Sequence, residues 1–360
     1  MNDNYIITIL TQLLQRALFN NDLNKVALAP ISDAYWNQIY TIAAQQGVLA
    51  LVFDAVATLP LEQQPPRALK MKWIASIANI EGRYNYQKRA AMELAEQFHR
   101  NNITTYVLKG FAIAGYYPKP EHRECGDLDC FLGGDYERGN CVAETIGAKV
   151  TREYYKHSII VYRKLMVENH QFCIAIRGSR ALKEFERHLE KSISNGATMI
   201  DGSHLIKPSA DFNALFITTH AMTHFLVEGI KLRHILDWAL LLKAEQENIN
   251  WGEFYQWADK MHLTRFADAM TAICVEHFGL QVTNPDIHTS SPYAERILHD
   301  TIQNSEGIHN KGYSAWKSRF MQIRNRLSFA WKYHKIYQKS LLVELCKSIF
   351  AFIFERHPKL

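Results

Sequence analysis

The first hundred residues carry apolar side chains at helical spacing. The segments 5–19, 34–57 and 66–100 repeat apolar residues every three or four positions, and a proline-rich break at 60–66 separates the last two. One stripe in the third segment, set between charged positions, consists of Ala90, Ala91, Leu94 and Phe98. The pattern therefore predicts three helices in this region and no strand.

After residue 102 the pattern changes to that of strands. Residues 103–108 are rich in β-branched and aromatic side chains, the pair Lys109-Gly110 is typical of a turn, and 111–117 reads as a short apolar helix. Residues 127–132 alternate in the manner of a half-buried strand. One face of this strand would present Asp127, Asp129 and Phe131, and the other Leu128, Cys130 and Leu132.

Two further strands follow a predicted helix over 136–146, which Asp135 is placed to cap. The segments 157–162 and 165–170 are both rich in β-forming residues, and only two positions separate them. Such spacing predicts a hairpin that turns at 163–164.

Helical spacing returns near residue 211 and continues to the carboxyl end. The order of elements therefore predicts an α+β fold in which a small mixed β-sheet is flanked by two helical regions. We expect an N-terminal helical region over 1–100, an α/β core over 101–205 and a C-terminal helical region over 206–360.

Composition indicates a globular protein, with 48% hydrophobic and 21% charged residues. The six cysteines form no CxxC pair, which argues against a disulfide framework or a zinc finger. The amino terminus lacks the basic start and cleavage site of a secretory signal, and no apolar run reaches the roughly 18–20 residues that span a bilayer. We therefore expect a cytoplasmic protein without an integral membrane segment.

The carboxyl-terminal tail is the basic part of the chain. Residues 311–360 hold eleven Lys or Arg against two Glu, whereas the whole chain has a net charge of only +5. Basic and aromatic side chains that suit an RNA backbone are Trp316, Arg319, Arg324, Arg326, Trp331, Lys332, Tyr333 and Lys335. The apolar segment 340–354 fits a helix at a membrane surface, and also a last core helix with a solvated basic face.

Asp127 and Asp129 are the strongest chemical signal. Two residues apart on a strand, their Cα atoms lie roughly 6.6 Å apart and their carboxylates lean the same way. Carboxylate pairs of this kind hold Mg²⁺ ions for phosphoryl transfer. Glu168 is the candidate third carboxylate, provided that the hairpin lies beside the Asp strand. An isolated D-x-D is common by chance, however, and also fits a solvated strand edge.

Neighbouring residues suit a phosphate group. The Lys109-Gly110 turn offers backbone amides and an ammonium group, the helix after it adds its positive amino-terminal end, and Arg123 can pair with the acids or with a triphosphate. His220 and His224 share a helix face, although a zinc site is less expected there than contact with a substrate. Arg233 and Asp237 have the spacing of a helical ion pair.

The complete string VLKGFAIAGYYPKPEHRECGDLDCFL resembles the signature of an uncharacterised nucleotidyltransferase family of the DNA polymerase β superfamily. The matching positions are Leu108, Lys109, Gly110, Tyr117, Pro118 or Pro120, Arg123, Asp127 and Asp129. The resemblance extends over about 80–240. Two departures are the Lys-Gly turn, where better-known members have Gly-Ser, and a glutamate as the third acid in place of aspartate.

The resemblance implies a nucleotidyltransferase core. Asp127, Asp129 and Glu168 would be catalytic and would bind two Mg²⁺ ions, with Mn²⁺ as the alternative ion. Lys109, Gly110 and Arg123 would bind the nucleotide. Secondary candidates for contact with the substrate are His170, His220, His224, Arg233 and Asp237.

The implied reaction transfers a nucleoside monophosphate from an NTP to an unidentified hydroxyl acceptor and releases pyrophosphate. Two alternatives stay open: a toxin of the abortive-infection type with the same chemistry, and a non-catalytic nucleotide-binding scaffold. Phosphate-loop, dinucleotide-turn and nucleophile-elbow motifs are absent, which argues against P-loop kinases and hydrolases.

Overall fold

The computed structural model describes residues 3–19, 31–152, 155–175, 179–303 and 329–344. Its amino-terminal part is helical, as predicted. The helices are α1 (Asp3–Phe19), α2 (Asp33–Gln45), α3 (Leu49–Val56), the short η2 (Leu61–Gln63) and α4 (Arg67–Arg100). The single helix expected over 34–57 is in fact two, because Gly47 adopts a φ of +68° that ends α2.

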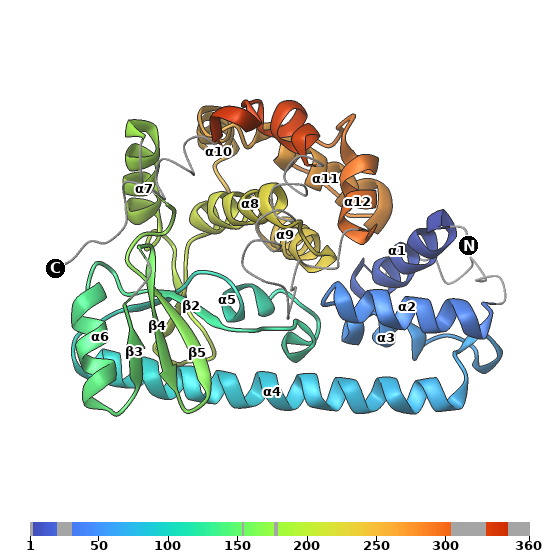
Figure 1. Cartoon of the computed structure of the whole chain (residues 1–360), viewed down its shortest axis with the longest axis horizontal. Coiled ribbons are helices and arrows are strands. Elements are labelled where there is room, and N and C mark those ends of the chain that lie inside the picture. Colours follow the sequence, from blue (N-terminus) through green and yellow to red (C-terminus); the bar gives the residue numbers. More distant parts are fainter. Residues whose placement is uncertain (1–2, 20–30, 153–154, 176–178, 304–328, 345–360) are drawn as a thin grey trace.

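Helix α4 has 34 residues and connects the two parts of the molecule. It extends along one side of the structure, beneath α2 and α3 at one end and beneath the sheet at the other (Figure 1). Its first half contributes Trp73, Ile77 and Ile80 to the larger hydrophobic core. Its second half buries the predicted stripe, including Leu94 and Phe98, in a smaller core against the sheet.

The sheet has seven strands in the order β3-β4-β5-β2-β1-β7-β6. They are β1 (Thr105–Val107), β2 (Leu128–Phe131), β3 (Lys149–Thr151), β4 (His157–Tyr162), β5 (Leu165–His170), β6 (Thr198–Met199) and β7 (Leu205–Lys207). Strand β2 runs parallel to β5 and β1 runs parallel to β7, while the other neighbours are antiparallel. The sheet is therefore mixed, and β2 lies at its centre.

The strand predicted over 127–132 is present as Leu128–Phe131, but Asp127 lies in the bend before it, and both faces of the strand are buried where one was expected to be. Leu128, Cys130 and Leu132 pack in the smaller core, whereas Phe131 belongs to the larger core on the other face. The hairpin β4–β5 has the predicted bounds. Arg163 and Lys164 both have positive φ, as a tight two-residue hairpin turn requires.

Short helices connect the strands: α5 (Phe111–Ala114), η3 (Pro120–His122), α6 (Tyr136–Thr145) and α7 (Arg180–Ser192). Helix α5 has only four residues, so the helix predicted over 111–117 is too long. Asp135 precedes α6 as predicted, but its side chain makes no capping hydrogen bond and pairs with Arg138 instead.

The carboxyl-terminal part is helical again, with α8 (Ala210–Val227), α9 (Leu232–Glu245), α10 (Trp251–Lys260), α11 (Thr264–Phe278) and α12 (Ala294–Gln303). Apolar side chains of α8, α9 and α11 share the larger core with those of α1, α2 and α3. The α+β fold predicted from the sequence, with a mixed sheet between helical regions, is therefore confirmed.

The described part of the basic tail packs on the body. A π-helical turn, η4 (Lys332–Tyr337), contains Lys332, whose fully buried ammonium group lies 2.6 Å from Asp300 and over the rings of Phe225 and Phe329. Lys332 is therefore not part of an exposed basic face. Half of the residues expected to contact RNA lie outside the described residues, namely Trp316, Arg319, Arg324 and Arg326. Most of the segment 340–354 also lies outside them.

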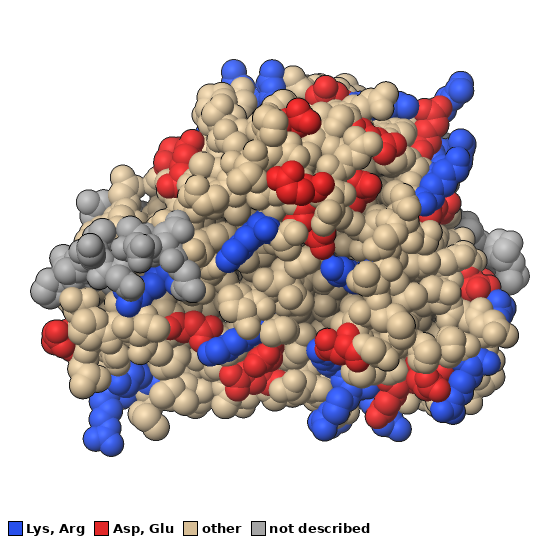
Figure 2. Space-filling model, turned by 180° about the vertical axis from the view of Figure 1, so that it is seen from behind, with Lys and Arg blue, Asp and Glu red and all other residues tan. Residues whose placement is uncertain are grey.

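Acidic and basic side chains are interspersed on the face of the molecule seen in Figure 2, where neither sign dominates a continuous area of the described surface. A continuous positive surface is what nucleic-acid binding without sequence preference requires. Contact of the tail with RNA or a membrane surface thus stays a prediction. Within the described ranges, none of the helices combines the length and apolar character needed to cross a membrane.

Candidate functional site

Three carboxylates meet on one face of the sheet. Asp129 on β2 is the direct neighbour of Glu168 on the parallel strand β5, so the two side chains point to the same face. Asp127 lies two positions before Asp129. One oxygen from each of the three carboxylates lies within 4.8 Å of the other two. The structure therefore brings together Asp127, Asp129 and Glu168, the three acids predicted from the sequence to be catalytic, which form the triad.

Asp129 is the buried centre of this triad, with 2% of its side chain exposed. Its Oδ2 lies 3.0 Å from Nζ of Lys109, and its Oδ1 lies 3.2 Å from Nε2 of His170. Burial favours the neutral acid, but the charge of Lys109 and the hydrogen bond with His170 outweigh it and hold the pKa of Asp129 well below its usual range. Asp129 is therefore an anion at neutral pH.

The other two carboxylates respond differently to this environment. Burial and the nearby charge of Asp129 raise the pKa of Asp127, while a hydrogen bond with His170 lowers the pKa of Glu168. Oxygen atoms crowded on partly buried carboxylates are the ligands that hard divalent cations prefer. The mutual repulsion of the acids would be relieved by such an ion, so the residues present fit Mg²⁺ or Mn²⁺.

The turn after β1 holds Lys109 against the triad. The backbone N–H of Leu108 donates to the carbonyl of Asp129 over 3.0 Å, which extends the pairing of β1 with β2 up to the turn. Burial alone would lower the pKa of Lys109, but the charges of Asp129 and Asp127 raise it, so the ammonium form is retained. Helix α5 beyond the turn is too short to contribute the positive end that the sequence suggested.

Gly110 gives this turn its shape. Its φ of +60° and ψ of −113° lie in a region that side chains with a Cβ atom avoid. We expect Gly110→Ala to lower the free energy of unfolding by about 1–3 kcal/mol through backbone strain. Denaturant titration measures this change. The matched control is Gly115→Ala, at a φ of −61° with open space around the new methyl group. An equal loss in both variants would contradict the role of the turn.

Arg123 lies beside the triad but is engaged elsewhere. Its Nε and Nη2 donate to the two carboxylate oxygens of Asp237 on α9 over 2.9 and 2.7 Å, and only 5% of its side chain is exposed. Tyr117 also donates to Asp237, over 2.7 Å. These contacts tie the loop before β2 to α9. They do not support the predicted contact of Arg123 with a nucleotide.

The predicted ion pair between Arg233 and Asp237 is wrong, because Asp237 is taken by Arg123. Arg233 instead donates from Nη1 to the backbone carbonyl of Glu124 over 2.6 Å. From the other side, Gln87 of α4 donates to the carbonyl of Gly126 over 3.1 Å. Both side chains therefore hold the segment that leads into the Asp strand, which is a positioning role.

Histidines of the carboxyl-terminal helices cover the Lys109 side of the site. Nε2 of His220 lies 3.4 Å from Nζ of Lys109 and 3.0 Å from Nε2 of His224, both histidines being on α8. The ring of His234, which the sequence analysis did not single out, stacks on that of His224 at 5.6 Å. Burial, followed by neighbouring positive charge, lowers the pKa of both His220 and His234 well below the usual value.

The lowered pKa of His220 predicts that the stability of the fold depends on pH. In the unfolded chain His220 binds a proton below about pH 6.5, whereas in the folded protein it stays neutral, so acidification favours unfolding. We expect stability to fall as pH drops below about 6.5, and His220→Gln to reduce that slope by roughly 1.4 kcal/mol per pH unit. Urea titrations between pH 5 and 8 measure it.

His122 provides an internal comparison with the opposite sign. Although burial lowers its pKa, hydrogen bonds with Asp54 and Glu81 raise it overall. Its stabilising contribution is therefore full below about pH 6.5 and is lost as pH rises above that value. His122→Gln should change the stability curve above pH 6.5, and His220→Gln below it. An unchanged acid slope in His220→Gln would contradict the buried neutral histidine.

Two site residues at the start of β4 were missed by the sequence analysis. Burial lowers the pKa of Lys156 and of His157, and both groups interact electrostatically with Glu168 and Asp129. The sequence offers only a basic pair at the start of the predicted strand 157–162, which by itself does not indicate a site. A cavity of about 460 Å³ lined by Ile6, Ile7, Ile42, Ile302 and Gln303 includes none of the site residues.

Comparison with known proteins agrees with this geometry. A family model described as an uncharacterised nucleotidyltransferase matches residues 32–279, a longer stretch than the 80–240 expected from the motif. No curated protein and no solved structure shows a significant match. The family model spans well over half of the 360 residues and includes the whole triad. The chain therefore belongs to this nucleotidyltransferase family.

Proposed function

We propose that the protein is a metal-dependent nucleotidyltransferase that moves a nucleoside monophosphate from an NTP to a hydroxyl acceptor. The observation that carries this proposal is the pairing of Asp129 with Glu168 across parallel strands, with Asp127 beside them. Membership of a nucleotidyltransferase family supports it. In the reaction the acceptor oxygen attacks the α-phosphorus, the bond from that phosphorus to the β-phosphate oxygen breaks, and pyrophosphate leaves.

Each side chain has a role that follows from its position. Asp127, Asp129 and Glu168 would hold two Mg²⁺ ions, which when bound neutralise the phosphate oxygens and stabilise the attacking and leaving oxygens. Nζ of Lys109 pairs with Oδ2 of Asp129 at 3.0 Å. From this position it is close enough to the triad to contact a phosphate. The hydroxyl proton of the acceptor passes to a carboxylate of the triad.

The helical side of the site suits the acceptor. His220, His224 and His234 come from α8 and α9, with His220 3.4 Å from Lys109 and the rings of His224 and His234 packed beside it. Burial keeps His220 neutral, so its ring can donate or accept a hydrogen bond without adding charge next to Lys109. Such groups suit a polar acceptor that carries hydroxyl groups.

Two radioactive labels test the proposal. The protein is incubated with Mg²⁺ and each of the four NTPs, labelled at either the α- or the γ-phosphate, in the presence of sugars, polyols, RNA or proteins. We expect the α-label to move to an acceptor and the γ-label to leave in pyrophosphate. Transfer of the γ-label would instead indicate a kinase. Binding of NTP without movement of either label would indicate a non-catalytic scaffold.

A further inference from the structure

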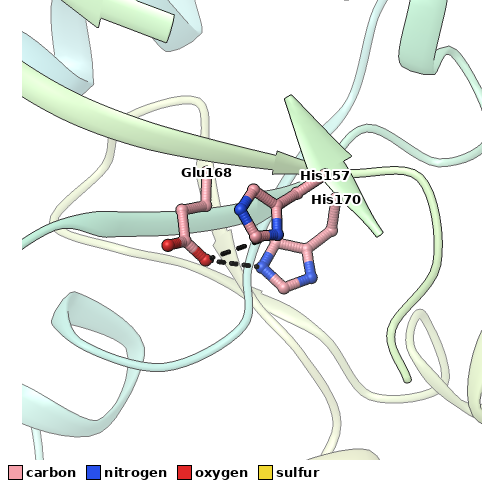
Figure 3. A group of neighbouring side chains, drawn as sticks. All are labelled: His157, Glu168 and His170. Carbon is pink, nitrogen blue, oxygen red and sulfur yellow. Dashed lines mark ion pairs between the residues drawn. The ribbon is translucent and has the colours of Figure 1, made fainter. Parts of the chain in front are cut away.

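Two histidines extend the carboxylate site at the open end of the β4–β5 hairpin. His157 begins β4 and is the direct cross-strand neighbour of His170, which ends β5. Glu168 lies two positions before His170, so alternation along the strand places all three side chains on the face that carries Asp129. Figure 3 shows the two rings converging on the carboxylate of Glu168.

The spacing of these three side chains suits a metal ion. Oε2 of Glu168 lies 3.5 Å from Nε2 of His170 and 3.8 Å from Nδ1 of His157. One donor atom from each residue lies within 4.8 Å of the other two. Ligands bound tetrahedrally at about 2.1 Å from zinc are roughly 3.4 Å apart. The distances from Glu168 to the two histidines exceed this spacing by only a few tenths of an ångström, so small side-chain movements would bring these donors to it.

His170 already has the orientation of a ligand. Its Nδ1 lies 3.3 Å from the backbone carbonyl of Phe172, which accepts a hydrogen bond from the Nδ1–H. Its Nε2 points to Asp129 and Glu168 at 3.2 and 3.5 Å, and an ion bound there would take the place of the proton that this nitrogen donates to the carboxylates. Metal-binding histidines are typically oriented in this way, with one nitrogen held by a carbonyl and the other directed at the ion.

The chemistry of the donors differs between the two halves of the site. Asp127 and Asp129 offer only oxygen, which suits Mg²⁺, whereas His157 and His170 offer imidazole nitrogen, which suits divalent transition metals. Glu168 belongs to both sets of donors. An ion held by the two histidines and Glu168 would thus lie next to one held by the three carboxylates.

We propose that Glu168 bridges two unlike metal positions, an oxygen position at Asp127 and Asp129 and a nitrogen-containing position at His157 and His170 that selects a divalent transition metal. This inference deepens the proposed function and rests on it for the role of the ions. It predicts that the protein binds Mn²⁺ through nitrogen, and that Zn²⁺ competes for this position more strongly than Mg²⁺ does.

Electron paramagnetic resonance with Mn²⁺ alone, in the absence of nucleotide, tests the nitrogen position. The whole protein is titrated with Mn²⁺, and pulsed experiments detect magnetic coupling to ¹⁴N of a bound imidazole. We expect ¹⁴N coupling in the wild type. In His157→Gln and His170→Gln we expect weaker coupling and Mn²⁺ affinity lower by on the order of 10- to 100-fold or more, since outer-shell changes alone reach that range.

His204→Gln is the matched control. His204 also lies beside a carboxylate, with its Nε2 3.1 Å from Glu96, but it is next to β7 and belongs to no such group of donors among the residues that the structure describes. We expect its Mn²⁺ affinity and ¹⁴N coupling to equal those of the wild type. Circular dichroism confirms that each variant is folded.

Bound Mn²⁺ without ¹⁴N coupling, equal affinity in the histidine variants, or no Mn²⁺ binding at all would overturn the proposal. Any of these results would instead identify the histidines as ion-pair partners of the carboxylates. The label-transfer assay with Mg²⁺ is independent of this result. Transfer of the α-label with Mg²⁺, together with failure of the ¹⁴N experiment, would leave the proposed function intact and remove only the second metal position.

Discussion

Replacing Asp129 with Asn is expected to reduce release of pyrophosphate by on the order of 10²- to 10³-fold or more, the range measured when one preorganised electrostatic contact to a transition state is lost. Asp129 is the most buried of the three carboxylates, and Lys109 lies next to one of its oxygens and His170 next to the other. The amide is nearly isosteric, so the variant removes the charge and the metal ligand while keeping the volume. Release of pyrophosphate from Mg²⁺ and NTP, with an acceptor present, measures the loss.

The matched control for this variant is Asp135→Asn. Asp135 lies just beyond β2, but it pairs with Arg138 at the surface and is outside the triad. Its activity should stay within about twofold of the wild type, because exposed ion pairs contribute little. If Asp129→Asn kept wild-type activity, or if Asp135→Asn lost as much, the assignment of the triad would be wrong.

The largest expected effect on stability comes from Asp237→Asn. Arg123 is buried and donates twice to Asp237, so removal of the carboxylate leaves a guanidinium without its counter-ion. Breaking a buried pair in this way costs about 3–5 kcal/mol. At roughly 2 °C per kcal/mol, the melting temperature should fall by about 6–10 °C. Calorimetry or thermal melts followed by circular dichroism measure the shift.

Two further variants identify the cause of that loss. In Arg123→Met/Asp237→Leu both charges are replaced by apolar groups, and part of the stability should return because no charge stays buried alone, while the buried Tyr117 hydroxyl still lacks its acceptor. Glu96→Gln removes exposed pairs with Arg100 and His204 and should leave the melting temperature nearly unchanged. A double variant as unstable as Asp237→Asn would show that the loss comes from packing and not from the unpaired charge.

Local patterns were sufficient to predict the strand that carries the acids. Alternation over 127–132 separated Asp129 from Leu128 and Cys130, and the two hydrophobic cores lie on the faces that this alternation required. The hairpin was predicted with its bounds because its turn and both strands are contiguous in sequence. Glu168 faces the acids because the register between that hairpin and β2 pairs it with Asp129.

Contacts between distant segments could not be predicted in this way. Arg123 and Asp237 are 114 positions apart, so the helical spacing of Asp237 with Arg233 was the only pairing visible in the sequence. The same limit applies to β7, which returns parallel to β1 after three α-helices, one 3-10 helix and five strands in the described part of the chain. The spacing of residues along one helix or strand shows which of them share a face. Which other element packs against that face depends on the whole fold.

The bend at Gly47 and the metal-binding geometry of His157 were missed for different reasons. A single glycine inside an apolar helical pattern is tolerated, so its φ of +68° had no sequence signal strong enough to divide the helix. His157 acquires its role only from the cross-strand neighbour His170. An isolated histidine at the start of a strand gives no sign of a second one opposite.

The proposed function requires that the three carboxylates form a metal-dependent nucleotide site. Isothermal titration calorimetry with Mg²⁺ and each of the four NTPs, on the wild type and on Asp127→Asn/Asp129→Asn, tests it most directly. We predict Mg²⁺-dependent binding of at least one NTP by the wild type and its loss in the folded double variant. Equal binding by both proteins, or no binding of any NTP by the folded wild type, would contradict the claim.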